Sequence, residues 1–149
     1  TKQMYPYVKI QILDGDIVRA SPLAKDVGFT KKHRADHILR MAYISKLFAD
    51  HGILVICAFV SPDRQVRNKA RKLIGTNRFV EVYVKASQKT RLKRDAKGMY
   101  KKAIAGKLSH FTGLTAPYDV PRHPDVTCST DTESLTQSTQ KVLSYIFHK

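Results

Sequence analysis

The chain of 149 residues is long enough for one domain with a substantial core, and its hydrophobic fraction of 42% is ordinary for a globular protein. Its 27 Lys and Arg residues against 12 Asp and Glu give a formal net charge of +15, which indicates anionic partners such as nucleotides, a polynucleotide or a membrane surface. No apolar run is long enough to span a bilayer, no stretch resembles a signal peptide, and two cysteines without a framework suggest a reducing compartment, so we predict a cytoplasmic protein without a membrane partner.

Residues 7–14 form the first predicted strand, and its apolar run ends in Asp14-Gly15-Asp16. Gly15 allows the backbone to turn sharply there, which places both carboxylates where open α/β sheets bind their ligands. Arg19 follows one helical turn later and suits an anionic substrate because its donors form a fork. A plain strand ending in an Asp-Gly turn is the alternative interpretation of this stretch. Residues 16–29 then have the composition of a polar connection.

Residues 30–50 have the apolar spacing of a helix. The continuous apolar run at 53–60 is typical of a central parallel strand that is buried on both faces. A second helix is expected to begin with Ser61 as its N-cap and Pro62 as its first residue, and to end at Gly75.

Four further elements are predicted: a strand at 79–86, a basic helix at 88–95, a short strand at 126–128 and a final helix. A capping box at residues 130–133 opens the final helix. The final helix should contain the apolar residues Leu135, Val142, Leu143 and Ile146. The alternation of strands and helices predicts one α/β domain over residues 1–149 with a parallel sheet, and a ligand site along the ends of its strands.

Residues 85–107 contain nine Lys or Arg residues and one acidic residue, Asp95. One interpretation is a solvated basic helix and loop. The other is a mobile lid over residues 97–113, in which Lys97 and its neighbours neutralise phosphate charge and Phe111 stacks on a purine. Phe111 suits a core anchor for the loop equally well.

Six segments resemble the adenylylsulfate (APS) kinase family in their order and approximate spacing. They are residues 13–19, 27–29, 46–52, 58–62, 94–103 and 111–113. The resemblance implies a P-loop kinase-like fold, with a parallel sheet flanked by helices and a mobile basic lid. It also implies an enzyme of sulfate assimilation that uses ATP and Mg²⁺. The enzyme would transfer the γ-phosphoryl group of ATP to the 3′-hydroxyl of adenylyl sulfate, giving 3′-phosphoadenylyl sulfate (PAPS).

The resemblance also implies roles for single residues. Asp16 matches the family's catalytic carboxylate beside the 3′-hydroxyl and Mg²⁺, Lys97 matches its lid lysine, and Ser61 matches a serine described as able to carry phosphate. The predicted substrate-binding residues are Asp14, Arg19, Phe29, Arg34, His37, Val60, Phe111 and Thr112. Among them, Phe29 and Phe111 match an aromatic pair that sandwiches the adenine. Arg94 matches an arginine near the ATP base.

The sequence also departs from the family pattern. The GxxxxGK[ST] phosphate loop is absent from it. We expect that loop and a strand before Thr1 in the natural protein, with residues 1–5 as the tail of a helix. His37 stands at a usual asparagine and Ile104 at a lid arginine. Two alternatives therefore stay open: a kinase of the same fold with another nucleotide acceptor, and a non-catalytic nucleotide-binding relative. The expected partners are adenylyl sulfate and ATP, without nucleic acid, and a homodimer is left open.

Overall fold

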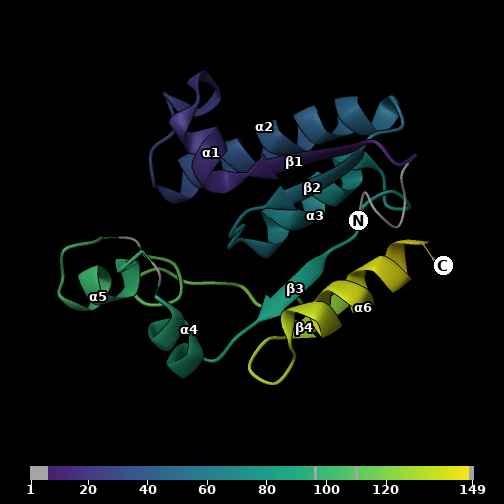
Figure 1. The fold of residues 1–149 in the computed structure, drawn as a ribbon. Coiled ribbons are helices and arrows are strands. Elements are labelled where there is room, and N and C mark those ends of the chain that lie inside the picture. Colours follow the sequence, from purple (N-terminus) through teal and green to yellow (C-terminus); the bar gives the residue numbers. More distant parts are fainter. Residues whose placement is uncertain (1–6, 96, 110, 148–149) are drawn as a thin grey trace. The chain divides into compact units, whose positions relative to one another are not determined.

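The computed structural model describes residues 7–95, 97–109 and 111–147. The chain divides into two compact units, Thr1–Phe79 and Val80–Lys149, and each unit is described by itself (Figure 1). The predicted helix tail at residues 1–5 lies outside the described residues. A single domain over the whole chain stays a prediction.

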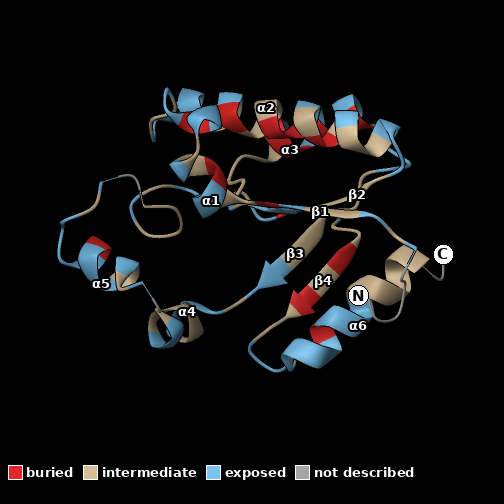
Figure 2. Cartoon of the chain, turned by 45° about the horizontal axis from the view of Figure 1, so that its top comes forward, coloured by how far each residue is buried: buried red, intermediate tan, exposed pale blue. Residues whose placement is uncertain are grey.

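The first unit is built on a pair of parallel strands. Its elements are β1 (Ile10–Asp14), α1 (Gly15–Ala20), the 3-10 helix η1 (Pro22–Ala24), α2 (Lys31–Asp50), β2 (Leu54–Ala58) and α3 (Arg64–Ile74). Ile10 lies opposite Leu54 in the parallel register, and α2 belongs to the crossover that parallel strands need. Helices α2 and α3 pack side by side over one face of this sheet (Figure 2).

Helix α2 confirms the prediction at residues 30–50. Thr30 is its N-cap, and the Thr30 hydroxyl accepts a hydrogen bond from the backbone N–H of His33 at 3.1 Å. Its buried residues are His37, Met41, Ala42 and Ser45. This stripe has the helical spacing that the sequence shows, and it forms the inner face of the helix.

The prediction that the second strand is buried on both faces is wrong for the described part of the chain. Leu13 on β1 is buried against Val18 and Met41. Ile12 and Ile56 lie opposite each other in the register, yet they are 61% and 42% exposed. Successive side chains of a strand point to opposite faces, and α2 and α3 cover only one of the two. The apolar run therefore has one covered face and one open face in this unit.

Helix α3 begins two residues later than the sequence suggested. Its N-cap is Asp63, and the Asp63 carboxylate accepts hydrogen bonds from the N–H groups of Gln65 at 2.8 Å and Val66 at 3.2 Å. The predicted start, with Ser61 as N-cap, is therefore wrong, because Ser61 has a φ of +40° and lies in the loop before the helix. Gly75 ends the helix as predicted.

The second unit also consists of parallel strands with flanking helices. Its elements are β3 (Val82–Lys85), α4 (Gln88–Arg94), α5 (Met99–Ile104), β4 (Val126–Ser129) and α6 (Leu135–Phe147). Strands β3 and β4 are parallel, with Val82 opposite Val126. Helix α6 packs on β4, where the thiol of Cys128 donates to the carbonyl of Ser138 at 3.7 Å. Parallel strands with flanking helices in both units confirm the predicted α/β class.

The capping box of the final helix lies later than predicted. The Ser134 hydroxyl accepts from the N–H of Gln137 at 3.2 Å, and the Gln137 side chain accepts from the N–H of Ser134 at 2.8 Å. The box predicted at residues 130–133 is therefore wrong, and Leu135, the first residue of α6, is 85% exposed. Within the described ranges, no helix combines the length and the apolar character needed to cross a bilayer.

Candidate active site

The chain turns from β1 directly into a helix at the Asp14-Gly15-Asp16 segment. The Asp14 carboxylate accepts hydrogen bonds from the N–H groups of Asp16 at 2.9 Å and Ile17 at 3.2 Å, so Asp14 is the N-cap of α1. Residues 16–29 were expected to be a plain connection, and that expectation is wrong because they contain α1 and η1. The Asp14 side chain is engaged in capping, so its predicted contact with substrate stays a prediction.

Gly15 brings the ends of the two strands of this unit close together. A side chain added at Gly15 would place its Cβ 3.1 Å from the carbonyl oxygen of Ala58 and 3.1 Å from the ring of Phe59. Such spacing is tighter than ordinary van der Waals contact, and glycine avoids the clash. The Asp-Gly-Asp turn therefore lies against the carboxyl end of β2, where parallel α/β sheets bind their ligands.

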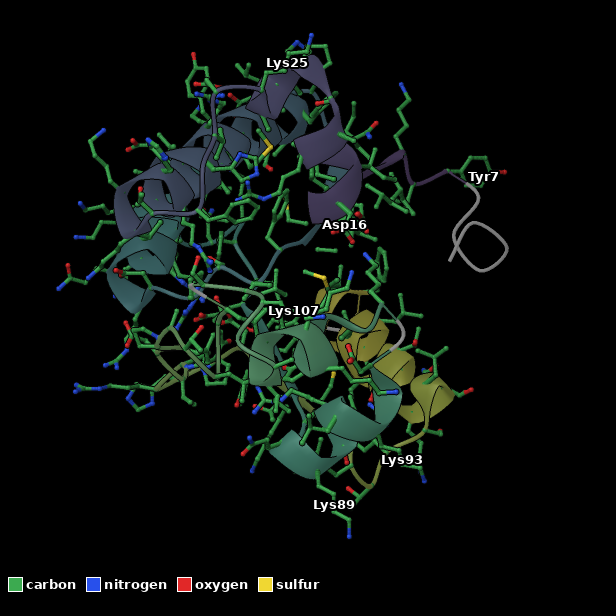
Figure 3. All side chains as sticks on the ribbon, turned by 90° about the vertical axis from the view of Figure 1, so that its left-hand side faces the viewer. Tyr7, Asp16, Lys25, Lys89, Lys93 and Lys107 are labelled. Carbon is green, nitrogen blue, oxygen red and sulfur yellow. The ribbon has the colours of Figure 1, made fainter. Side chains whose placement is uncertain are left out.

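Asp16 is exposed on the first turn of α1 (Figure 3). Among the residues with described placement, no cluster of three or more His, Cys, Asp or Glu side chains is arranged to hold a metal ion. Mg²⁺ is usually bound by one or two carboxylates together with substrate phosphates and water. An exposed carboxylate at a strand end fits that pattern, so Asp16 is a suitable single ligand.

Two arginines lie beside the ring of Phe29. The guanidinium carbon of Arg19 lies 4.6 Å from the ring centroid and that of Arg34 lies 5.9 Å from it. Both also hold the loop, since Arg34 Nε donates to the Phe29 carbonyl at 2.9 Å and an Arg19 Nη atom donates to the Val27 carbonyl at 3.4 Å. The Phe29 ring itself is 61% exposed. The structure thus joins three of the predicted substrate-binding residues.

The positive charges of Arg19 and Arg34 repel each other. Burial, and then the nearby charge of Arg19, lowers the pKa of the Arg34 guanidinium below its ordinary value. Like charges in a partly buried place raise the free energy of both cations, and a bound anion reverses that effect. The pair is therefore suited to an anion with several oxygen atoms.

His37 lies one helical turn after Arg34 on α2 and is only 2% exposed. Its ring contacts the edge of Phe59, with 5.7 Å between centroids and an interplanar angle of 74°. Burial, followed by the charges of Arg19 and Arg40, lowers the pKa of His37 below 6.5. The imidazole is therefore neutral at pH 7.

The loop after β2 contains Val60 and Ser61. Val60 is 64% exposed, and Ser61 has the left-handed φ of +40°. Arg67, which is 7% exposed, donates to the Ser61 carbonyl at 2.8 Å and so holds this conformation. Unusual backbone conformations of this kind cost about 1–3 kcal/mol and persist mainly where a function or the surrounding packing maintains them.

The predicted lid residues lie in the second unit. The Asp95 carboxylate accepts hydrogen bonds from the N–H groups of Tyr100 and Lys101, each at 3.0 Å, and so caps α5. Lys97 is exposed in the turn just before this helix. Lys89 and Lys93 on α4 also project into solvent (Figure 3). The segment is therefore a basic surface built on two short helices.

Phe111 and Thr112 are held within their own loop. The Phe111 ring contacts the edge of Tyr100, with 4.8 Å between centroids, and the Phe111 N–H donates to the Thr115 hydroxyl at 2.8 Å. Thr112 forms a bridge with Ala116. The loop-anchor interpretation of Phe111 thus has direct contacts, and purine stacking by this ring stays a prediction.

Arg94 joins α4 to the turn after β4. Its guanidinium donates to the hydroxyl of Thr130 at 3.0 Å and to the carbonyl of Thr130 at 2.6 Å. In the same region, Ser87 donates to the Asp131 carboxylate through both its N–H and its hydroxyl, each at 2.9 Å. The two hydrogen bonds to Thr130 fix the Arg94 side chain, and its contact with the ATP base stays a prediction.

Two further arginines shape the first unit, and no sequence motif marks either of them. Arg67 supports Ser61, and the only sequence indication was its position on the same helix as the buried Ala70. Arg40 binds the Asp26 carboxylate with both Nη atoms, at 2.9 and 2.8 Å, across 14 residues. No local pattern predicts a contact over that separation.

Comparison with known proteins gives a consistent result. The chain matches the family model described as adenylylsulphate kinase over residues 2–129. It is 44% identical to the adenylyl-sulfate kinase of Halothermothrix orenii, covering 94% of this chain and 74% of the relative. It is 45% identical to that of Thermodesulfovibrio yellowstonii, covering 93% of this chain and 68% of the relative.

A solved structure is similar as well. The Mycobacterium tuberculosis APS kinase in complex with AMPPNP and APS matches with a TM-score of 0.87 and 33% identity, covering 97% of this chain and 84% of that one. This likeness confirms the predicted P-loop kinase-like α/β fold.

Proposed function

Because the chain belongs to the adenylyl-sulfate kinase family, we propose that it transfers the γ-phosphoryl group of ATP to the 3′-hydroxyl of adenylyl sulfate and so forms PAPS. The relatives that carry the name of this activity support the reaction. The similar structure that contains AMPPNP, an ATP analogue, and APS supports the two substrates. Within this chain, the cluster of Arg19, Phe29 and Arg34 carries the proposal.

That cluster has the chemistry of a site for an adenine nucleotide. The exposed Phe29 ring offers a face on which a purine can stack, because every base has a π-face. The guanidinium groups of Arg19 and Arg34 lie 4.6 and 5.9 Å from its centroid and bring forked donors for phosphate or sulfate oxygens. Base and anion are thus bound by neighbouring groups.

Asp16 is the proposed catalytic carboxylate. It lies at the end of β1, on the first turn of α1, and its exposure leaves it accessible to a substrate hydroxyl. We assign it the proton of the attacking 3′-hydroxyl, since positioning and charge neutralisation are the main tasks in phosphoryl transfer. Mg²⁺, when bound, neutralises charge on the phosphate oxygens, and Asp16 is the residue of this chain that fits it.

The other predicted site residues have supporting roles in this proposal. We assign Lys97 as the catalytic lysine of the predicted basic lid at 97–113, of which residue 110 lies outside the described residues. Ser61 positions the loop beside the acceptor through its constrained backbone. The remaining substrate-binding residues are Asp14, His37, Val60, Phe111 and Thr112, and Arg94 borders the ATP base. Phe111 provides the second aromatic surface for the adenine.

We also propose a cytoplasmic enzyme of sulfate assimilation, and we leave open whether it forms a homodimer. Neither a membrane nor nucleic acid is among the proposed partners, since basic charge in this chain is explained by phosphate-bearing substrates. Light scattering of the purified protein distinguishes a monomer from a dimer: twice the mass of one chain shows a dimer, and the mass of a single chain excludes it.

A second candidate function is phosphoryl transfer to another nucleotide acceptor. His37 and Ile104 favour it, because both replace polar residues that are usual in the family, and Ile104 is 64% exposed on α5. Such changes alter the groups that meet the acceptor without altering the fold.

The decisive experiment incubates the purified full-length chain with ATP, Mg²⁺ and adenylyl sulfate, and separates ADP and PAPS by chromatography. In separate reactions, AMP or CMP replaces adenylyl sulfate as the acceptor. A higher rate of phosphoryl transfer to adenylyl sulfate than to AMP or CMP supports the proposed function. A higher rate with another acceptor supports the second candidate. Binding of adenylyl sulfate without any turnover shows a non-catalytic relative.

A further inference from the structure

Arg91 on α4 contacts two parts of the basic surface of the second unit that are separate in the chain. Its guanidinium carbon lies over the Tyr100 ring, 6.0 Å from the ring centroid, in the first turn of α5. One Nη atom packs against the backbone of Gly113, where an added Cβ would lie 3.1 Å from that nitrogen. Gly113 also has a φ of +85°, a conformation that favours glycine. A single planar side chain thus touches both α5 and the loop after Phe111.

These two parts of the surface also touch each other. The Phe111 ring meets the edge of the Tyr100 ring, with 4.8 Å between centroids and an interplanar angle of 82°. The loop is closed on itself, since the N–H of Thr115 donates to the carbonyl of Phe111 at 2.9 Å. Arg91, Tyr100, Phe111 and Gly113 therefore form one cluster, which we call the Arg91 bridge.

Helix α4 gives this bridge a fixed base. Its N-cap, Ser87, donates to the Asp131 carboxylate through both its N–H and its hydroxyl, each at 2.9 Å. Near its other end, Arg94 donates to the hydroxyl and the carbonyl of Thr130 at 3.0 and 2.6 Å. Arg91 lies between these two anchors, so its contacts tie the start of α5 to the turn after β4.

Arg91 takes part in the bridge through the flat surface of its guanidinium. Its Nε atom is buried and has no hydrogen-bond partner among the residues that the structure describes. Buried polar atoms are nearly always paired, so the packing of the planar group outweighs an unmade hydrogen bond at this position. A guanidinium suits this role because it is planar and stacks on aromatic rings, whereas the ammonium group of lysine is a compact point charge.

We propose that Arg91 is a positioning residue, which orients Lys97 for phosphoryl transfer by holding the start of α5. Lys97 lies in the turn that leads to this helix. That turn is held at Tyr100, whose N–H donates to the Asp95 carboxylate at 3.0 Å and whose ring lies under Arg91. The inference rests on the proposed function for the role of Lys97. Arg91 itself lies outside the six segments that resemble the family.

The first test compares kcat with the Kd of adenylyl sulfate in the full-length chain. Arg91→Leu should lower kcat by about tenfold, because a lysine that acts on developing charge does so mainly in the transition state. Its Kd should stay within about threefold of wild type, because the acceptor cluster of Arg19, Phe29 and Arg34 lies in the first unit.

Two further variants separate the planar contact from charge. Arg91→Lys keeps the charge without the planar group, so it should still lose about fivefold or more in kcat. Lys93→Leu is the matched control, since it removes a cation from an exposed position on the same helix (Figure 3). Its kcat should stay within about twofold of wild type. Thermal unfolding of each variant shows whether its fold is intact.

A double-mutant cycle separates positioning from general support of the fold. If Arg91 acts through Lys97, then Arg91→Leu should lower kcat by less than about twofold in a Lys97→Ala background, because losses along one chain of contacts do not add. A residue that only supports the fold would lower kcat by the same factor in both backgrounds.

Limited digestion with trypsin measures the bridge without relying on catalysis. Cleavage after Lys101 and Lys102, which are exposed on α5, should be at least about fivefold faster in Arg91→Leu than in the wild type, because local opening exposes the backbone. Cleavage after Lys32, which is exposed on α2, should be unchanged. Mass spectrometry of the fragments assigns each cleavage.

Several outcomes would overturn the proposal. They are wild-type kcat in a folded Arg91→Leu, full recovery of kcat in Arg91→Lys, equal losses with and without Lys97, and unchanged cleavage on α5. Failure of the proposed function is a separate result, seen as a wild type that forms no PAPS. The trypsin digestion alone then decides whether Arg91 holds the start of α5.

Discussion

The guanidinium carbon of Arg19 lies 4.6 Å from the centroid of the Phe29 ring. A second pair in the first unit has nearly the same geometry, since Arg71 lies 4.8 Å from the ring of Phe79. Each arginine also donates to a backbone carbonyl, at 3.4 Å and 3.3 Å. A further arginine, Arg34, lies 5.9 Å from the centroid of the Phe29 ring. Two equivalent contacts in one chain therefore allow the proposed binding role to be separated from the structural one.

Replacing Arg19 by leucine should raise the KM for adenylyl sulfate by about 10–100-fold, because a charged hydrogen bond to the anion contributes about 1.5–3 kcal/mol. Arg71→Leu, the matched control, removes the same stacking contact and should change KM by less than about twofold. Steady-state kinetics of both variants checks this. Equal effects of the two substitutions would show that Arg19 acts only through packing.

Asp16→Asn should lower kcat by about 10²–10⁴-fold, the usual contribution of a general base, with little change in the Kd of adenylyl sulfate. The control is Asp36→Asn, which removes an exposed carboxylate that pairs with Lys32 on α2. Activity close to wild type in Asp16→Asn would exclude a catalytic role for this carboxylate.

Lys97→Ala should lower kcat by about tenfold or more, because a lysine that neutralises developing charge acts mainly in the transition state. Lys89→Ala removes a similarly exposed cation on α4 and should leave kcat unchanged. A loss that is common to both variants would indicate a general effect of surface charge, which increasing salt should then reproduce in the wild type.

Asp63→Ala should lower the free energy of unfolding by about 0.5–2 kcal/mol, because it removes the N-cap of α3. The exposed ion pair between Lys31 and Asp63, at 3.5 Å, adds little. Ser61→Ala should cost less, since its side chain is not the cap. Urea denaturation measures both, and a larger loss in Ser61→Ala would contradict the observed start of the helix.

Acid should remove the contribution of Asp26 to stability. The hydrogen bonds from Arg40 lower the pKa of Asp26 from 3.8 to about 2. A carboxyl group whose pKa is lower in the folded state stabilises the protein above about pH 4, and this stabilisation is lost as the pH falls toward about 2. The difference in unfolding free energy between wild type and Asp26→Asn should therefore be constant above about pH 5 and shrink below pH 4. A constant difference down to pH 2.5 would contradict this assignment.

Local patterns predicted the regular elements well. The helix at Lys31–Asp50 follows from its apolar spacing and from Thr30 as a cap, and Gly75 ends α3 as expected. Each of these signals acts within about four residues, which is the range of helical hydrogen bonds and caps. The same range explains the errors, since Ser61 and Asp63 are both good N-caps and only the backbone conformation selects between them.

Burial was harder to predict than secondary structure. The run at Leu54–Ala58 has the composition of a strand covered on both faces, but Ile56 is 42% exposed. Apolar composition records the preference of each side chain, whereas burial depends on which elements lie against the strand. The resemblance to the family likewise implied that Arg19, Phe29 and Arg34 belong to one site, without indicating that both arginines would lie beside one ring.

The sequence by itself determined the family and the order of the four strands and of α2, α3, α4 and α6, because periodicity, caps and ordered motifs are properties of residues close together in the chain. Only the tertiary structure decided that Arg40 binds Asp26, that Arg67 holds Ser61, and that His37 is buried with ring nitrogens that lack a partner among the described residues. The physical reason is that these features arise when separate elements pack, and the free energy of each contact depends on neighbours that no local pattern specifies.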